Sequence, residues 1–296
     1  MEKCSIKRGR LSATILSFGA ILHELWIPDK NNTLVNTVAG LPQLSDYDTD
    51  EWFRGAVVGP YAGRLSNPVA IKNQLHTIKH TTNYPLLHGG AHSWAKQFWH
   101  LKQLQPHSVE ASLTCTEESK EFPGSITVTV RYELLENGLR LSYEAFTTAP
   151  TPINSTNHAY FNLGGDANAA SHLLTVNAHE YLALDAALLP TGEQIPTKGS
   201  PYDFTKEKAV NDTALDHYFI APQPHKASCY HPSTGIQMDV FSDQFGIVIF
   251  RPPHFEALCF ETQAPSDATR FDTFPDCIAT PERPYKQETS YLFHIR

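Results

Sequence analysis

The chain has 296 residues, with 23 Lys plus Arg against 31 Asp plus Glu and a formal net charge of −8. This acidic balance argues against a nucleic-acid or anionic-membrane partner, because both require a basic surface. No stretch of the sequence approaches the roughly 20 apolar residues of a membrane-spanning helix. The length allows one or two domains, and all-β folds of this size often form one.

The cysteines and the N-terminus both indicate a cytoplasmic protein. The apolar run Leu11–Leu22 follows basic residues as a signal peptide would, but no cleavage site follows it and its pattern continues as a sheet. The cysteines are odd in number, widely spread and never in a C-x-x-C pair, which is typical of buried thiols in a reducing compartment. They are Cys4, Cys115, Cys229, Cys259 and Cys277.

Short apolar runs bounded by turn residues dominate the first part of the chain. Ala13–Trp26 predicts a pair of strands, and the residues 28–32 predict the turn that follows it. Leu44–Trp52 is the first segment that predicts a short helix, with Ser45 or Asp46 as its N-cap.

The same pattern of short strands and turns continues to the C-terminus. Asn137-Gly138 is the strongest hairpin signal in the sequence. No internal repeat or linker divides the chain. We therefore expect one domain over residues 1–296, an all-β fold that forms a large antiparallel β-sandwich with few short helices. The further predicted strands are Leu75–Ile78, Trp99–Leu104, Ser108–Thr116, Ile126–Leu134, Leu139–Phe146, Leu173–Val176, Tyr181–Leu184, Ile236–Phe241, Ile247–Phe250, Ala257–Glu261 and Tyr291–Ile295.

Several well-known chemistries have no sequence support. The chain lacks a G-x-x-x-x-G-K-[ST] phosphate loop, a G-x-G-x-x-G turn, a G-x-S-x-G elbow and an H-E-x-x-H zinc motif. His88 and His92 are four residues apart, but Gly89-Gly90 would break the helix that this spacing needs for metal binding. We expect neither a metal nor an organic cofactor.

The segment Thr156–Gly165, with the sequence TNHAYFNLGG, carries the most informative pattern. In a strand, His158, Tyr160 and Asn162 would share one face and leave an apolar face opposite. His, Tyr and Asn are side chains that can hold and protonate a polyhydroxylated small molecule. The alternative is a polar outer face with a satisfied histidine.

Four other segments carry candidate site residues. Arg64 lies in the Gly-rich segment 57–67, where its planar donors would suit sugar hydroxyls or oxyanions, and His88 precedes two glycines that would let a ligand approach the backbone. Asp216 opens the segment DHYF. Glu261 ends an apolar strand in ALCFETQ, on the face opposite Leu258 and Phe260, where a carboxylate is not needed for solubility.

These segments, in this order, resemble the aldose 1-epimerase or galactose mutarotase family over essentially the whole chain. The family pattern is an Arg loop followed by L-H-G-G, T-N-H-x-Y-F-N-L, P-T-G-E, D-H-x-F and E-x-Q. The matching residues are Arg64, Leu87–Gly90, Thr156–Leu163, Pro190–Glu193, Asp216–Phe219 and Glu261–Gln263. The resemblance implies the large β-sandwich of that family, a small-molecule sugar as partner and no cofactor.

The resemblance also implies roles for individual residues. Glu261 would be the general base that takes the proton from the C1 hydroxyl of the sugar, and His158 the general acid that protonates the ring oxygen. Arg64, His88 and Asp216 would hold ring hydroxyls and help keep His158 charged. The alternatives are a loop histidine packed on tryptophan for His88 and a turn aspartate for Asp216.

Tyr160 could stack on a face of the sugar ring. The sequence departs from the family pattern near Pro60, Gly63 and Val248, where the family has residues expected to contact the substrate. The acid His158 and the base Glu261 are unchanged. The preferred reading is a mutarotase for free aldohexoses, as a monomer or homodimer. The alternatives are a sugar-binding or regulatory protein without turnover, and a sugar-phosphate epimerase.

Overall fold

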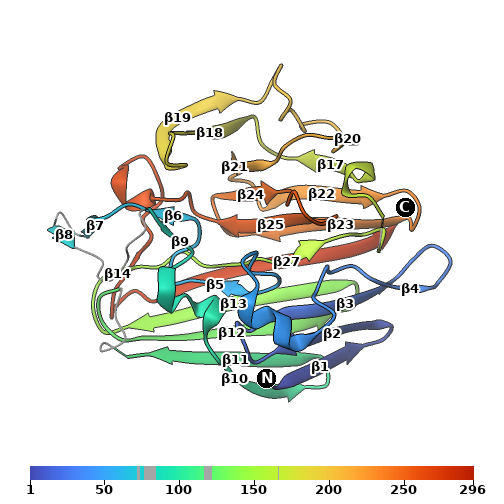
Figure 1. Ribbon diagram of the computed structural model, residues 1–296, viewed down its shortest axis with the longest axis horizontal. Helices are drawn as coiled ribbons and strands as arrows, with labels where there is room; N and C mark the ends of the chain where they lie inside the picture. Colours follow the sequence, from blue (N-terminus) through green and yellow to red (C-terminus); the bar gives the residue numbers. More distant parts are fainter. Residues whose placement is uncertain (72–73, 77–84, 117–121, 166) are drawn as a thin grey trace.

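The structure is a computed structural model that describes residues 1–71, 74–76, 85–116, 122–165 and 167–296. Antiparallel strands joined by turns make up the fold of these residues (Figure 1). The expectation of few short helices is confirmed, because the helices of the described residues are 3-10 helices of three to six residues. They are η1 (Leu44–Thr49), η2 (Gly90–His92), η3 (Trp94–Lys96), η5 (Ala169–Ser171) and η6 (Ala268–Arg270). None of them is long and apolar enough to cross a membrane.

Two large sheets contain most of the strands, as the predicted sandwich requires. The nine-stranded sheet has the order β10 (His100–Gln105), β11 (Ser108–Cys115), β12 (Ile126–Leu135), β13 (Gly138–Thr147), β27 (Tyr285–Ile295), β23 (Ile236–Ser242), β22 (His225–His231), β17 (Leu173–Val176) and β20 (Lys208–Ala209). The six-stranded sheet has the order β16 (Tyr160–Phe161), β25 (Leu258–Gln263), β24 (Gly246–Phe250), β21 (Asp216–Ile220), β18 (Glu180–Leu184) and β19 (Pro190–Pro196).

Smaller sheets complete the fold. The N-terminal sheet packs through β1 against β10, β11 and β12 (Figure 1), and its strands are β1 (Lys3–Arg8), β2 (Leu11–Leu16), β3 (Leu22–Pro28) and β4 (Leu34–Asn36). Four two-stranded pairs remain: β5 (Val57–Val58) with β15 (Thr156–Asn157), β6 (Arg64–Leu65) with β9 (Leu86–Leu87), β7 (Val69–Ile71) with β8 (Gln74–His76), and β14 (Thr151–Pro152) with β26 (Ile278–Ala279). The last two residues of the predicted strand Leu75–Ile78 lie outside the described residues.

The predicted hairpin at Asn137-Gly138 is present, but its turn lies one residue earlier. Leu135 pairs with Gly138, so Glu136 and Asn137 form the turn and Gly138 begins β13. A Cβ atom on Gly138 would lie 2.3 Å from the carbonyl oxygen of Tyr291 on the neighbouring β27. Gly138 therefore allows β13 to pack closely against β27, because a side chain at this position would clash with it.

The predicted helix Leu44–Trp52 is shorter than expected and its N-cap was wrong. The helix is a 3-10 helix that ends at Thr49, and its N-cap is Gln43, whose side chain makes no capping hydrogen bond. The carboxylate of Asp50 ends the helix, because it accepts hydrogen bonds from the backbone N–H groups of Trp52 and Arg54. Such local side-chain bonds compete with helical ones.

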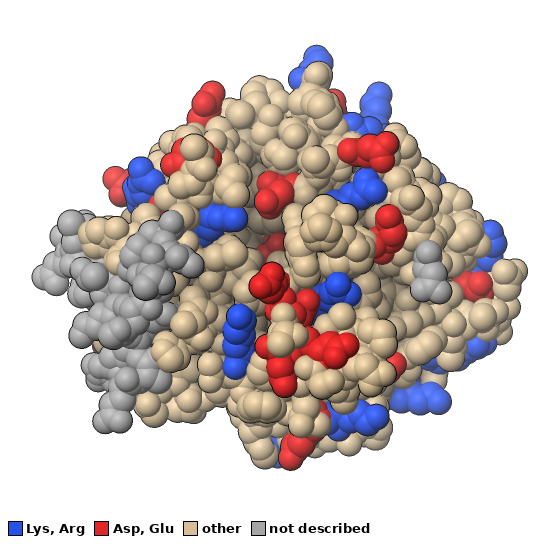
Figure 2. All heavy atoms as spheres, in the orientation of Figure 1, with Lys and Arg blue, Asp and Glu red and all other residues tan. Residues whose placement is uncertain are grey.

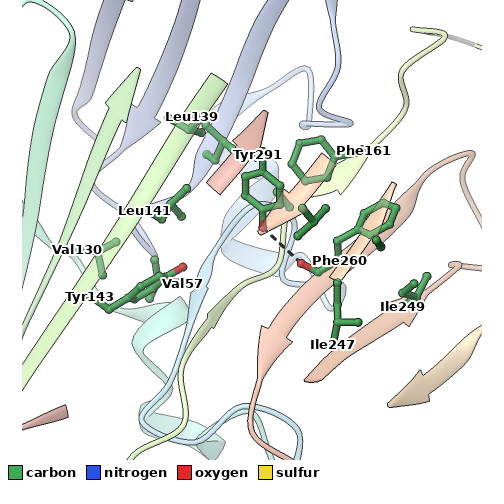
Figure 3. Close-up of a cluster of buried hydrophobic side chains, with 14 of the residues drawn as sticks. Val57, Val130, Leu139, Leu141, Tyr143, Phe161, Ile247, Ile249, Phe260 and Tyr291 are labelled. Atoms are coloured by element: carbon green, nitrogen blue, oxygen red, sulfur yellow. Dashed lines mark hydrogen bonds between the residues drawn. The ribbon is translucent and has the colours of Figure 1, made fainter. Parts of the chain in front are cut away.

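The hydrophobic core lies between the two large sheets and fixes which face of β25 turns away from it (Figure 3). Phe260 packs against Phe161, with 6.2 Å between ring centroids, and the Tyr291 hydroxyl donates a hydrogen bond of 3.4 Å to the Phe260 carbonyl. Burying an aromatic side chain of this size stabilises the fold by about 2–3 kcal/mol. Because side chains alternate along a strand, Glu261 lies on the opposite face from Phe260, as predicted.

The segment Thr156–Gly165 is two short strands and not one. β15 ends at Asn157 and β16 begins at Tyr160. The Asn157 side chain causes the break, because its carbonyl accepts the Ala159 N–H and its amide donates to the Gly55 carbonyl. His158 therefore sits at an irregular point between the strands, held through its own backbone by Gly55 and Ala56.

Candidate active site

A cleft of about 310 Å³ opens beside β25 and β24 and collects the predicted site residues. Figure 2 shows a hollow near the middle of this face, over the region of β6, β24 and β25, with acidic and basic side chains at its edge. All six predicted site residues line the cleft. The lining residues are Glu51, Trp52, Phe53, Gly63, Arg64, Leu87, His88, His158, Tyr160, Leu184, Leu188, Pro190, Asp216, Tyr218, Val248, Phe250, Glu261, Gln263 and Ser266.

His158 and Glu261 face each other on the wall of this cleft. The Nε2 atom of His158 lies 3.5 Å from Oε1 of Glu261, and each side chain is only 5% exposed. On the other side of the imidazole, the Cys259 thiol lies 3.5 Å from Nδ1. The ring is thus held between two side chains of one face of β25, because residues 259 and 261 point the same way.

Burial shifts the pKa values of both groups toward their neutral forms. Burial raises the pKa of Glu261 to about 8, with a further rise from Asp216 and an opposing effect of Arg64. Burial lowers the pKa of His158 to about 4, partly offset by a hydrogen bond to its own backbone. Between these values the pair as a whole holds one proton. Burial therefore opposes the charged form of each group, and the carboxylate and imidazolium that the resemblance implies for catalysis stay a prediction.

His88 lies against His158 and presents one ring nitrogen as a donor. Their rings meet edge to face at 5.3 Å between centroids, and Nδ1 of His88 accepts the backbone N–H of Gly63 at 3.2 Å. Burial, then the nearby His158 and Arg64, hold the pKa of His88 well below its usual value, so the ring is neutral. The remaining proton is then on Nε2. His88 packs against Phe53 rather than against a tryptophan.

Arg64 and Asp216 come from different strands and lie at the rim of the cleft. Arg64 is half-buried on β6, paired with Leu87 of β9, which places it beside His88. Asp216 begins β21, and partial burial raises the pKa of its carboxyl while Arg64 opposes this rise. The guanidinium of Arg64 and the carboxyl group of Asp216 thus line the same cleft as Glu261, where they can hold polar groups of a ligand.

Tyr160 lines the cleft, whereas Asn162 has a structural role. The Tyr160 ring lies 5.0 Å from the His158 ring, and its hydroxyl donates to the Trp52 carbonyl. The ring of Tyr160 thus belongs to the wall of the cleft, and its stacking on a sugar stays a prediction. The Asn162 amide donates to the carbonyls of Ala167 and Glu256, and it is not among the residues that line the cleft.

His88, His158 and Glu261 are also close enough to hold a metal ion, with ligand atoms within 4.8 Å of one another. The hydrogen bonds do not favour this use. In His88 one ring nitrogen accepts the Gly63 N–H and the other carries the proton, so the neutral ring offers no free lone pair. His92, the partner suggested by spacing, lines a different cavity.

Sequence reasoning placed Val248 and Gln263 within the family pattern but listed neither as a site residue. Val248 and Gln263 both face the cleft beside Glu261. The alternation along β25 could have identified Gln263, because it lies two residues after Glu261 and therefore on the same face of the strand. The aromatic lining residues carry no sequence signal that distinguishes them from core residues.

Replacement of Glu261 by Gln is expected to raise stability most at alkaline pH. The pKa of Glu261 is higher in the folded chain than in the unfolded one, so its contribution to stability is present below about pH 4.5 and is lost as the pH rises to about 8. The amide resembles the protonated carboxyl and escapes this loss. In thermal unfolding at pH 5, 7 and 9, the difference in Tm between variant and wild type should grow with pH. A constant difference would contradict the shifted pKa.

The fold and the cleft together define a β-sandwich protein with a buried acid–base pair placed for chemistry on a small polar ligand. A family model described as Aldose 1-epimerase matches residues 2–292. The chain belongs to the aldose 1-epimerase family.

Individual relatives agree with this assignment. The chain is 28% identical to galactose mutarotase from Homo sapiens over 324 residues, which cover 100% of this chain and 94% of that protein. It is 24% identical to aldose 1-epimerase from Escherichia coli (strain K12), with coverage of 95% and 91%. The crystal structure of the GalM/aldose epimerase homologue from C. elegans matches with a TM-score of 0.93 and 27% identity over 99% of each chain.

Proposed function

We propose that this protein is a cofactor-independent aldose 1-epimerase that interconverts the α and β anomers of free aldohexoses such as galactose or glucose. The observation that carries the proposal is the buried pair of His158 and Glu261, whose ring nitrogen and carboxylate oxygen lie 3.5 Å apart in a cleft lined with hydrogen-bonding groups. Membership of the aldose 1-epimerase family supports the same activity.

In the proposed reaction, which starts from the form of the pair with its proton on His158, Glu261 takes the proton from the C1 hydroxyl and His158 gives its proton to the ring oxygen O5. The C1–O5 bond breaks, and the open aldehyde rotates about C1–C2. It recloses on its other face when His158 takes the proton back from the C5 hydroxyl and Glu261 returns its proton to the former carbonyl oxygen. No atom is gained or lost, and the pair carries one proton throughout.

The pKa shifts favour ring opening within this cycle. Ring opening leaves Glu261 protonated and His158 neutral. Burial favours the same proton distribution, because it raises the pKa of Glu261 and lowers that of His158. The cleft therefore stabilises the pair in the form that accompanies the open aldehyde.

Charge in the cleft favours a free sugar over a sugar phosphate. Among the described lining residues, Arg64 is the one Lys or Arg, whereas Glu51, Asp216 and Glu261 are carboxylates. A phosphate group would need more cationic donors than this. A binding protein without turnover would not need a buried acid and base in contact with each other.

The direct test is polarimetry on freshly dissolved α-D-galactose and α-D-glucose. Wild-type protein should accelerate the approach to anomeric equilibrium. Acceleration only with the 6-phosphate esters would indicate a sugar-phosphate epimerase instead. Binding of either free sugar without acceleration would indicate a sugar-binding or regulatory protein.

We also propose a single domain over residues 1–296 that acts in the cytoplasm as a monomer or homodimer on a small-molecule sugar. The five cysteines support the reducing compartment, because none forms a disulfide in the described residues. One hydrophobic cluster that extends from Ile6 to Phe293 supports the single domain.

Replacement of Arg64 by Ala is expected to raise KM about tenfold or more with a smaller effect on kcat. Arg64 lies at the rim and contacts neither His158 nor Glu261 in an ion pair, so its role is to hold the ligand. Initial rates over a range of galactose concentrations measure both constants. A loss confined to kcat would instead place Arg64 in the proton-transfer step.

A further inference from the structure

Gln263 ends β25 and lines the cleft with a side chain that has no hydrogen-bond partner. It lies two residues beyond Glu261 on the same face of the strand, and it is fully buried. Neither Oε1 nor Nε2 of its amide forms a hydrogen bond with any described residue, although both atoms are buried. A buried amide without partners costs roughly 1–3 kcal/mol for each unsatisfied group.

The contrast with Gln287 shows that this fold can satisfy a buried glutamine. Gln287 lies on β27, on the other side of β25, and is also buried. Its Nε2 donates to the Thr262 carbonyl at 2.9 Å, and its Oε1 accepts from the Tyr285 hydroxyl. A structural glutamine next to β25 is therefore fully bonded, whereas the one that faces the cleft is not.

The main chain of Gln263 is fixed while its amide is available to a ligand. The Tyr218 hydroxyl donates to the Gln263 carbonyl at 3.1 Å, which holds this end of the strand. On the side of Nε2 lie Gly63 and Ser266: a Cβ added to Gly63 would be 3.4 Å from Nε2 and 2.0 Å from the Ser266 hydroxyl oxygen, and Nε2 forms no hydrogen bond with that hydroxyl. Val248, also in the cleft wall, has an apolar side chain that offers the amide no partner.

We propose that Gln263 is a specificity-determining residue of the sugar site, with its amide hydrogen-bonded to ring hydroxyls remote from C1. This inference rests on the proposed function. Side chains two residues apart on a strand are about 7 Å apart, so a sugar with its C1 hydroxyl at Glu261 reaches Gln263 with the far side of its ring. The amide has one donor group and one acceptor, which match two neighbouring hydroxyls because each hydroxyl both donates and accepts.

The test replaces Gln263 by Met, which keeps the length of the side chain and removes its polar atoms. KM for galactose should rise about ten- to a hundredfold, with kcat changed by less than about threefold, as expected for the loss of neutral hydrogen bonds to a substrate. Thermal stability should stay equal to that of the wild type or rise, because no bond within the protein is lost. Unchanged KM, or a fall in Tm of several degrees, would overturn the proposal.

Gln287→Met is the matched control. It breaks the bonds to Thr262 and Tyr285, so it should lower Tm, and its KM should stay near the wild-type value. If both variants lowered Tm alike and neither changed KM, Gln263 would be a structural residue and the proposal would be wrong.

Sugar analogues give a second test that does not depend on stability. Galactose derivatives that lack one ring hydroxyl at a time should show a large rise in KM at one position or at two neighbouring positions in the wild type. This penalty should disappear in Gln263→Met, because the partner of that hydroxyl is gone. Equal penalties in both proteins at every position would overturn the proposal.

The same series separates this inference from the proposed function. If wild-type protein does not accelerate mutarotation, ligand-observed NMR measures Kd for the same sugars. A penalty in Kd that depends on Gln263 would then support the inference while the epimerase proposal fails. If the wild-type protein accelerates mutarotation and Gln263→Met behaves in the same way, the epimerase proposal stands and the inference about Gln263 is wrong.

Discussion

Glu261→Gln is expected to lower kcat for galactose mutarotation by about 10²–10⁴-fold, the range for loss of one positioned proton transfer. Glu261 is the group that takes the C1 proton in the proposed reaction, and an amide cannot accept it. The amide fills the same space and can still hydrogen-bond the C1 hydroxyl. Sugar affinity should therefore change little, so kcat and kcat/KM should fall together.

Polarimetry gives kcat for this variant, and ligand-observed NMR gives its Kd for galactose. The matched control is Glu136→Gln in the turn between β12 and β13, whose carboxylate is 83% exposed and remote from the cleft lining. It makes the same chemical change and should keep full activity. Wild-type turnover by Glu261→Gln would remove Glu261 from the mechanism, and loss of binding alone would make it a ligand contact.

Strand periodicity predicted the fold because it reflects burial directly. Along β12 the side chains alternate between the core and solvent, so Val128 and Val130 identified the strand from sequence alone. The helix at Leu44–Trp52 was predicted less well, because its end depends on which backbone groups the Asp50 carboxylate accepts. A competing local hydrogen bond of that kind leaves no periodic signal.

The site was predicted as a set of residues but not as an electrostatic arrangement. Motif order identified His158 and Glu261, and the fold brings them to 3.5 Å. The location of their shared proton depends on burial by residues from distant segments, so no local pattern contains it. Gln263 was matched to the E-x-Q pattern but received no role in the site, for a similar reason. Its significance is the absence of partners among the described residues, which only three-dimensional contacts reveal.

His158→Asn is expected to lower kcat by a similar 10²–10⁴-fold and to change the pH dependence of what remains. In the wild type, only the pair with one proton is competent. Below about pH 4 both groups are protonated and no base remains, whereas above about pH 8 both are deprotonated and no acid remains. A plot of kcat/KM against pH should be bell-shaped with its plateau between these values, which belong to the pair as a whole.

The asparagine variant retains only the base, so its profile should lose the alkaline limb. Residual activity should rise with pH while Glu261 ionises and then stay level, because no second group remains to lose a proton. The control is His100→Asn, which makes the same change at an exposed histidine of β10 outside the cleft. Its plot of kcat/KM against pH should remain bell-shaped. If the plot of kcat/KM against pH for His158→Asn stayed bell-shaped with the wild-type width, another group would donate the proton to O5. A wild-type plateau confined to the range between pH 4.5 and 6.5, the ordinary values of Glu and His, would contradict the effect of burial on both groups.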